Sequence, residues 1–161
     1  MRWFRFALLI LAVTVLQKGL LARWSSKPDL LVILLVFFAI YYSTSDAIIS
    51  SFTIGFAADL VGSQMGSQMI SFGLFGTLLA YLHRVIAIKR MPYQALAIFV
   101  TSILTGFLTH LLAYITKGEP VAANIYAVVF MTSLYSSIVG PFLFLPSAWW
   151  MRIKINRFGR R

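Results

Sequence analysis

The side chains that could carry chemistry are few and far apart in this sequence. Only four residues are acidic, and they are spread over Asp29, Asp46, Asp59 and Glu119. The sequence has no HExxH zinc motif, no GxSxG nucleophile motif, no phosphate-binding loop and no clustered acidic motif that could hold a catalytic metal. Cysteine is absent, which excludes disulfides and thiolate chemistry. These observations argue against an enzyme and against a bound metal or cofactor.

Asp59 is the most informative single residue. An ionisable group inside an apolar span costs roughly 2.5 to 3.5 kcal/mol, so its side chain should face other helices and find a partner there. Ser51, Gly55 and Asp59 recur every four residues, which predicts a narrow stripe suited to close helix contact. A matching small surface follows at Gly73, Gly76 and Ala80. Asp59 could instead cap the turn at 62–66, or bind an ion or ligand.

Two pairs of polar residues lie at similar expected depths in the membrane and could therefore be in contact. His110 and Asp59 fall near the ends of their segments on the same side, so a contact between them is possible. His110 could equally bond to a backbone carbonyl, lie at the membrane interface or, least favoured, relay protons. Asp46 and Arg84 lie at comparable depth on the other side. A surface pair of that kind contributes about 0 to 1 kcal/mol.

Composition assigns the chain to the membrane. The mean hydropathy is +0.88 and only 11% of residues are charged, against about 25% in soluble domains. The net charge of +10 would suit a nucleic-acid binder, but the basic residues stand at the ends of apolar segments, where they orient helices. Arg2 and Arg5 before 6–16 resemble a signal peptide without its small cleavage residues. We therefore expect a retained first span.

The apolar segments predict an all-α membrane protein, with residues 1–161 forming one bundle of six transmembrane helices. The expected spans are 4–22, 30–42, 47–61, 69–82 extending toward 88, 93–114 and 121–150. The second and third are shorter than the hydrocarbon layer, so they must extend into flanking Ser and Thr, thin the bilayer or lie partly inside the bundle. Gly140, Pro141 and Pro146 should kink or break the last span, whereas Pro92 suits a first helical turn.

The distribution of Lys and Arg predicts that both termini are cytoplasmic. Six spans place ten basic residues inside, at Arg2, Arg5, Arg84, Lys89, Arg90, Arg152, Lys154, Arg157, Arg160 and Arg161. Four fall outside, at Lys18, Arg23, Lys27 and Lys117. This asymmetry agrees with the positive-inside rule, although three of the outer residues share one loop. Trp149 and Trp150 should anchor the last helix at the inner interface.

Three stretches resemble MreD, the rod shape-determining membrane protein family of the bacterial elongation machinery. Residues 27–35 read Lys-Pro-Asp before an aliphatic run, similar to the start of a family span. Residues 55–66 contain Asp-Leu followed by a glycine-rich turn, and residues 141–152 resemble the aromatic last helix and basic tail. Length, span count and the basic ends agree with the family over nearly the whole chain.

The resemblance implies a six-helix fold related to the substrate-binding subunits of energy-coupling-factor vitamin transporters. It also implies a non-enzymatic scaffold of the cell-elongation complex in the bacterial inner membrane, which binds MreC and through it RodA and a class B penicillin-binding transpeptidase. The bilayer is the other expected partner, and nucleic acid is not expected. Candidate helix-packing or partner-binding residues are Ser51, Gly55, Asp59, Gly62, Gly66, Gly73, Gly76, His110 and Pro141.

Two other classes of function stay open. A small-molecule transporter subunit of the related fold would need a polar ligand pocket and an Ala-x-x-x-Ala motif on the first helix. Ala7 and Ala12 do not provide that spacing. A lipid-modifying membrane enzyme is a weaker possibility, because the chain has so few acids.

Overall fold

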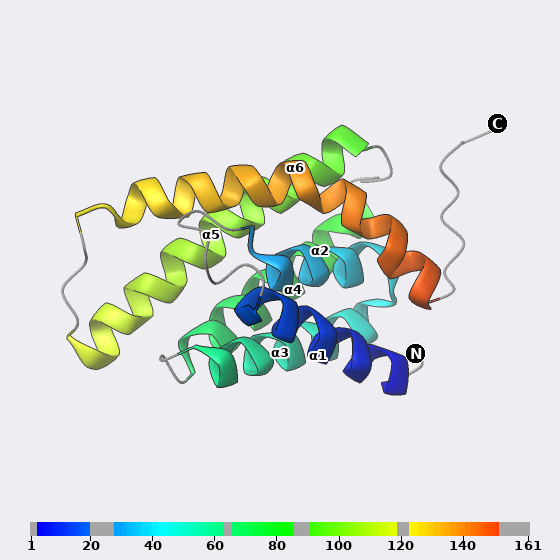
Figure 1. The fold of residues 1–161 in the computed structure, drawn as a ribbon, viewed down its shortest axis with the longest axis horizontal. Coiled ribbons are helices and arrows are strands. Elements are labelled where there is room, and N and C mark those ends of the chain that lie inside the picture. Colours follow the sequence, from blue (N-terminus) through cyan, green and yellow to red (C-terminus); the bar gives the residue numbers. More distant parts are fainter. Residues whose placement is uncertain (1–2, 20–27, 63–65, 86–90, 119–122, 152–161) are drawn as a thin grey trace.

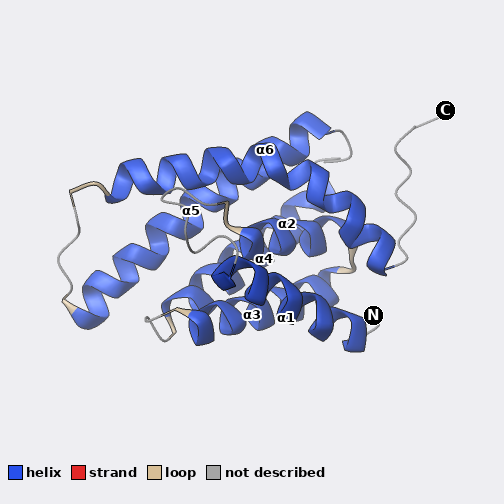
Figure 2. Cartoon of the chain, viewed as in Figure 1, coloured by secondary structure: helices blue, strands red, loops and turns tan. Residues whose placement is uncertain are grey.

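The computed structural model describes residues 3–19, 28–62, 66–85, 91–118 and 123–151. These residues form helices joined by short connections and contain no strand (Figures 1 and 2). The helices are α1 (Trp3–Gly19), α2 (Leu30–Tyr41), α3 (Thr44–Val61), α4 (Ser67–Val85), α5 (Met91–Lys117) and α6 (Ile125–Met151). The all-helical prediction is confirmed.

The helix bounds differ from the expected spans mainly at the last helix. Residues 123–124 form a turn, and α6 begins at Ile125, later than the predicted start at 121. In contrast, α3 and α5 are each longer than their predicted spans, and α4 begins two residues before its predicted start at 69. The expected parts at 20–22, 86–88 and 121–122 lie outside the described residues. The short polar segments that flank the apolar runs therefore contribute helical turns, as Thr44 and Ser67 do.

The start of α1 and the end of α6 lie side by side (Figure 1). The Trp150 indole Nε1 donates to the Arg5 carbonyl oxygen at 3.3 Å, and an Arg5 guanidinium nitrogen donates to the Trp150 carbonyl oxygen at 3.4 Å. At the other end of α1, the Gln17 amide donates to Asp29 Oδ1 at 3.2 Å. We call these the terminal end and the loop end of the bundle. Helices α2, α4 and α6 begin at the loop end.

Helix α2 is the core of the bundle. Every residue from Leu30 to Ile40 is buried, as expected for a helix that is apolar on all sides. Its 12 residues span only about 18 Å, against about 30 Å of hydrocarbon. The Phe37 ring packs on Phe144 of α6 at 5.4 Å and the Phe38 ring on Phe6 of α1 at 4.9 Å. The sequence left open whether this short segment extends into flanking residues, thins the bilayer or lies inside the bundle. The structure places α2 inside the bundle.

The buried ends of α2 have hydrogen-bond partners from side chains. Asp29 Oδ1 accepts from the backbone nitrogens of Leu31 at 3.1 Å and Val32 at 3.4 Å. The Asp29 backbone nitrogen itself donates to Ser136 Oγ on α6 at 2.8 Å. At the opposite end, the Gln94 amide of α5 donates to the Tyr41 hydroxyl at 2.9 Å. The contacts at the start of α2 satisfy free backbone N–H groups, which makes a helix end tolerable inside a bundle. The Gln94–Tyr41 bond at the opposite end joins side chains only.

Helix α6 bends without breaking. It continues through Gly140, Pro141 and Pro146, and Figure 1 shows the change of direction in its second half. An internal proline removes one helical hydrogen bond and displaces the preceding turn, which explains a bend at this point. Gly140 is buried, and a Cβ there would meet Ile98 of α5 and lie 3.5 Å from Ile33 Cγ1 of α2. The bend therefore lets α6 follow the core helix closely.

Two helices are long and apolar enough to cross a membrane. They are residues Pro92–Thr116 of α5 and Ile125–Met151 of α6. Helix α2 is apolar but shorter.

Candidate functional site

Asp59 of α3 caps the start of α4. Its Oδ1 accepts from the Gln68 backbone nitrogen at 3.0 Å and its Oδ2 accepts from the Met69 backbone nitrogen at 2.9 Å. The residue is only 5% exposed, and a carboxylate at a helix N-terminus is stabilised by the free N–H groups and by the helix dipole. Within the described part of the chain, no hydrogen bond joins Asp59 to His110. The carboxylate is thus used to join two helices.

Glycines let α3 and α4 touch along the same line. A Cβ on Gly55 would lie 2.7 Å from Met69 Cα and 3.0 Å from the Gln68 carbonyl oxygen, so the two backbones are in contact there. Further along α4, a Cβ on Gly73 would overlap the Phe52 ring, and one on Gly76 would overlap the Ser51 side chain. We call this contact the α3–α4 seam. Among the described residues it is the most extensive contact between two helices.

The remaining glycine and proline candidates act through the backbone. Gly62 ends α3, with its nitrogen donating to the Ala58 carbonyl oxygen at 2.8 Å. Gly66 has φ +93°, a conformation that side-chain-bearing residues rarely adopt, while a Cβ there would meet open space. Pro141 is buried in the bent part of α6. These residues shape the chain and offer no ligand atoms beyond their carbonyls.

A polar cavity of about 310 Å³ lies at the loop end, between α5, α6 and the starts of α2 and α4. The side chains with polar atoms that line it are Asp29, Gln68, Ser102, Thr105, Thr109, His110 and Thr132. Some are already bonded within the protein. Thr105 Oγ1 donates to the Thr101 carbonyl oxygen at 2.7 Å, and Ser102 Oγ is bonded to Ser133 Oγ at 3.0 Å.

Four of the lining side chains have no hydrogen bond to any described residue. They are the amide of Gln68, the hydroxyls of Thr109 and Thr132, and the imidazole of His110. Thr109 is only 7% exposed. The other three residues are partly exposed. Because buried polar groups in proteins nearly always have a partner, Thr109 is the residue that most clearly points to hydrogen bonds with something held in the cavity.

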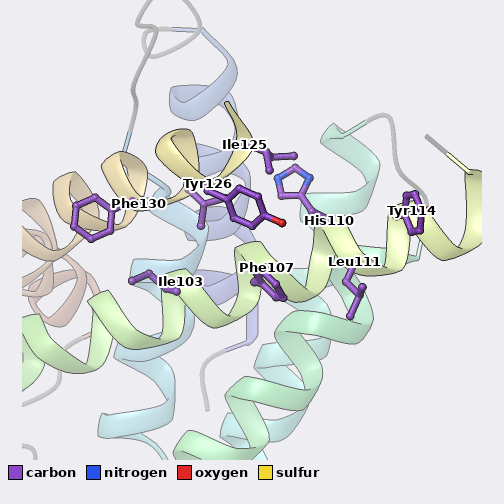
Figure 3. Close-up of a pocket in the computed structure, with 9 residues that line it drawn as sticks. Ile103, Phe107, His110, Leu111, Tyr114, Ile125, Tyr126 and Phe130 are labelled. Carbon is purple, nitrogen blue, oxygen red and sulfur yellow. The ribbon is translucent and has the colours of Figure 1, made fainter. Parts of the chain in front are cut away.

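An apolar groove adjoins this cavity. It has a volume of about 350 Å³ and lies between α5 and α6 near the connection that joins them (Figure 3). Its walls include Ile103, Phe107, Leu111, Ile125, Tyr126 and Phe130. His110 and Val129 line both spaces, and Figure 3 shows the His110 ring beside Ile125 and Tyr126. The groove and the cavity therefore meet at these two residues.

The sequence analysis missed the cavity, although a signal was present. Thr101, Thr105 and Thr109 recur every four residues and form one polar line on α5. All three are buried in the structure. The same spacing rule drew attention to Ser51, Gly55 and Asp59 on α3 and was not applied to α5.

The structure does not test the expected contact between Asp46 and Arg84. Asp46 lies in the first turn of α3, where its backbone nitrogen donates to Ser43 Oγ at 3.3 Å. The side chain of Arg84 lies outside the described residues. Across the described ranges, no group of three or more His, Asp or Glu residues could hold a metal ion.

Comparison with known proteins gives one match. A family model for the rod shape-determining protein MreD matches residues 1–154, which include all six helices. No curated protein and no solved structure matches the chain. The matched region also contains the three stretches that carry the resemblance, 27–35, 55–66 and 141–152. The chain therefore belongs to the MreD family, whose members take part in determining rod shape.

Proposed function

We propose that this protein is a non-enzymatic scaffold of the cell-elongation complex in the bacterial inner membrane. It would bind MreC directly, and RodA and a class B penicillin-binding transpeptidase through MreC. The match of residues 1–154 to the rod shape-determining family carries this proposal. Its six-helix bundle would be related to the substrate-binding subunits of energy-coupling-factor transporters.

We further propose that all six helices are membrane spans and that both termini are cytoplasmic. The contact between Arg5 and Trp150 supports this topology, because it holds the start of α1 and the end of α6 together. The Lys and Arg residues near the two ends of the sequence and just before α5 support the orientation. The absence of cysteine makes single-cysteine labelling straightforward. Gly118→Cys should react with an impermeant maleimide in intact spheroplasts, and Ser45→Cys only after permeabilisation. Equal labelling of both would contradict the topology.

The groove between α4 and α5 is a suitable surface for a partner's transmembrane helix. It has a volume of about 220 Å³ and is walled by apolar side chains such as Leu78, Leu96 and Val100. Helices associate in a membrane through close packing, so a groove of this kind favours a helical partner. Val100→Trp should weaken retention of MreC, whereas Ile138→Trp, on an exposed part of α6 outside the described cavities, should not.

Affinity purification of the tagged chain from native membranes tests the function. MreC should be recovered with the wild-type protein. Recovery of an energising ATPase in place of MreC would overturn the scaffold proposal and support a transporter subunit.

A further inference from the structure

We propose that the polar cavity and the apolar groove together bind one amphiphilic lipid. Its uncharged, hydroxyl-bearing head group occupies the cavity, and one hydrocarbon chain occupies the groove. The inference rests on the proposed function only in that α5 and α6 span the bilayer. It adds a ligand to a protein for which family membership assigns none.

The chemistry of the cavity suits a hydroxyl-bearing head group. Gln68, Thr109, Thr132 and His110 offer amide, hydroxyl and imidazole atoms that bond to no described residue. All four can form hydrogen bonds as donor or acceptor, and hydroxyl groups have the same dual capacity. Thr109 carries most weight, because it lines the cavity although the residue is only 7% exposed.

The charges around the cavity favour an uncharged head group over a phosphate. The starts of α2 and α4 are the places where backbone N–H groups could bind an anion, and both already hold a carboxylate, from Asp29 and Asp59. Asp29 also lines the cavity, and no lysine or arginine is among the described residues that do so. A phosphate placed there would meet a negative charge.

The groove provides a path for the hydrocarbon chain. A Cβ on Gly106 would lie 3.0 Å from Val129 Cγ1, so α5 and α6 are in close contact beside the cavity. Beyond this contact the two helices diverge toward their connection (Figure 1). The space between them is lined by Phe107, Leu111 and other apolar side chains (Figure 3). Each space lies within the range of about 300 to 1,000 Å³ that is usual for ligand sites.

Native mass spectrometry of the purified full-length chain tests the proposal, with dioleoylglycerol as the probe and dioleoylphosphatidylglycerol as the charged comparison. Dioleoylglycerol should bind in a one-to-one ratio and at least tenfold more tightly than the phospholipid. Thr109→Val, which removes a hydroxyl at nearly constant volume, should weaken binding about fivefold, corresponding to one lost hydrogen bond. Thr116→Val, on the exposed side of α5, is the matched control and should leave binding unchanged.

A second pair of variants tests the hydrocarbon path. Leu111→Trp should fill the groove and abolish dioleoylglycerol binding, whereas Ile115→Trp, one turn further along α5 and outside the groove, should not. Equal binding of both lipids, preference for the phospholipid, or binding insensitive to Thr109→Val and Leu111→Trp would overturn the proposal. MreC retention is measured on the same samples. Retained MreC without lipid selectivity refutes the lipid site alone, whereas selective lipid binding without MreC refutes the scaffold alone.

Discussion

The α3–α4 pair and the α5–α6 pair of helices use small and polar residues in opposite ways. In the α3–α4 seam, Gly55 brings backbones into contact and both oxygens of Asp59 are bonded to the start of α4. Between α5 and α6, Gly106 gives one close contact, while Thr109 and His110 face a space that no described side chain fills. We call α3 and α4 the closed pair, because their backbones touch and the Asp59 oxygens are bonded across the contact, although the buried Ser67 hydroxyl at the start of α4 has no partner among the described residues. We call α5 and α6 the open pair, because side chains between them have hydrogen-bonding atoms that bond to no described residue.

Gly55→Leu should have the largest effect, because it breaks the closed pair. Even a Cβ at this position meets the α4 backbone, at 2.7 Å from Met69 Cα, and backbone cannot move aside as a side chain can. Overpacking of this kind costs about 1 to 3 kcal/mol or more. We expect a lower thermal unfolding temperature in detergent and loss of MreC. Gly19→Leu, where a Cβ meets nothing within 4 Å, is the control. Wild-type stability and MreC retention in Gly55→Leu would refute the seam.

Asp59 substitutions should have the next largest effect. Asp59→Leu leaves the backbone nitrogens of Gln68 and Met69 without their acceptors. The cost is about 1 kcal/mol for each of these partly buried groups, at the low end of the range for buried ones. Asp59→Asn keeps one acceptor oxygen at the helix start and should be milder. Rod-shape complementation in a depleted strain, read together with membrane abundance, measures both. Normal abundance with complete loss of function in Asp59→Asn would contradict the capping role and favour ion or ligand transport.

Thr109→Val should have the smallest effect on stability. A small effect would show that this hydroxyl between α5 and α6 is not needed to hold the fold together. The Thr109 hydroxyl makes no described hydrogen bond, so its removal breaks none within the described structure. We expect the free energy of unfolding in detergent to change by no more than about 0.5 kcal/mol. Thr105→Val is the comparison, because that hydroxyl donates to the Thr101 carbonyl oxygen at 2.7 Å. A Thr109→Val variant destabilised more than Thr105→Val would show that the cavity hydroxyl has a structural role.

Apolar runs in the sequence predicted the helices, and the prolines predicted the place where α6 bends. Long apolar runs and the prolines of α6 are local signals, and they depend little on what packs against them. The burial of α2 was one of several possibilities. An apolar segment of 12 residues has the same kind of sequence whether lipid or protein surrounds it. Only the contacts of Phe37 and Phe38 with neighbouring helices distinguish the two.

The candidate site was harder to predict because its parts come from different helices. The sequence indicated that Asp59 needs a partner. The partner is the backbone of α4, and backbone N–H groups cannot be recognised from residue types. Likewise, the depth of His110 suggested contact with Asp59, while the structure places His110 beside Val129 and Tyr126 of α6. The direction in which a helix face points is set by packing across the whole bundle.

Direct binding of purified full-length MreC to this protein in nanodiscs tests the central claim, that the molecule acts by assembling partners. The account predicts a stable complex that persists in Thr109→Val and is lost in Gly55→Leu, because assembly depends on the closed pair of helices. No complex between the two purified wild-type proteins would contradict the account.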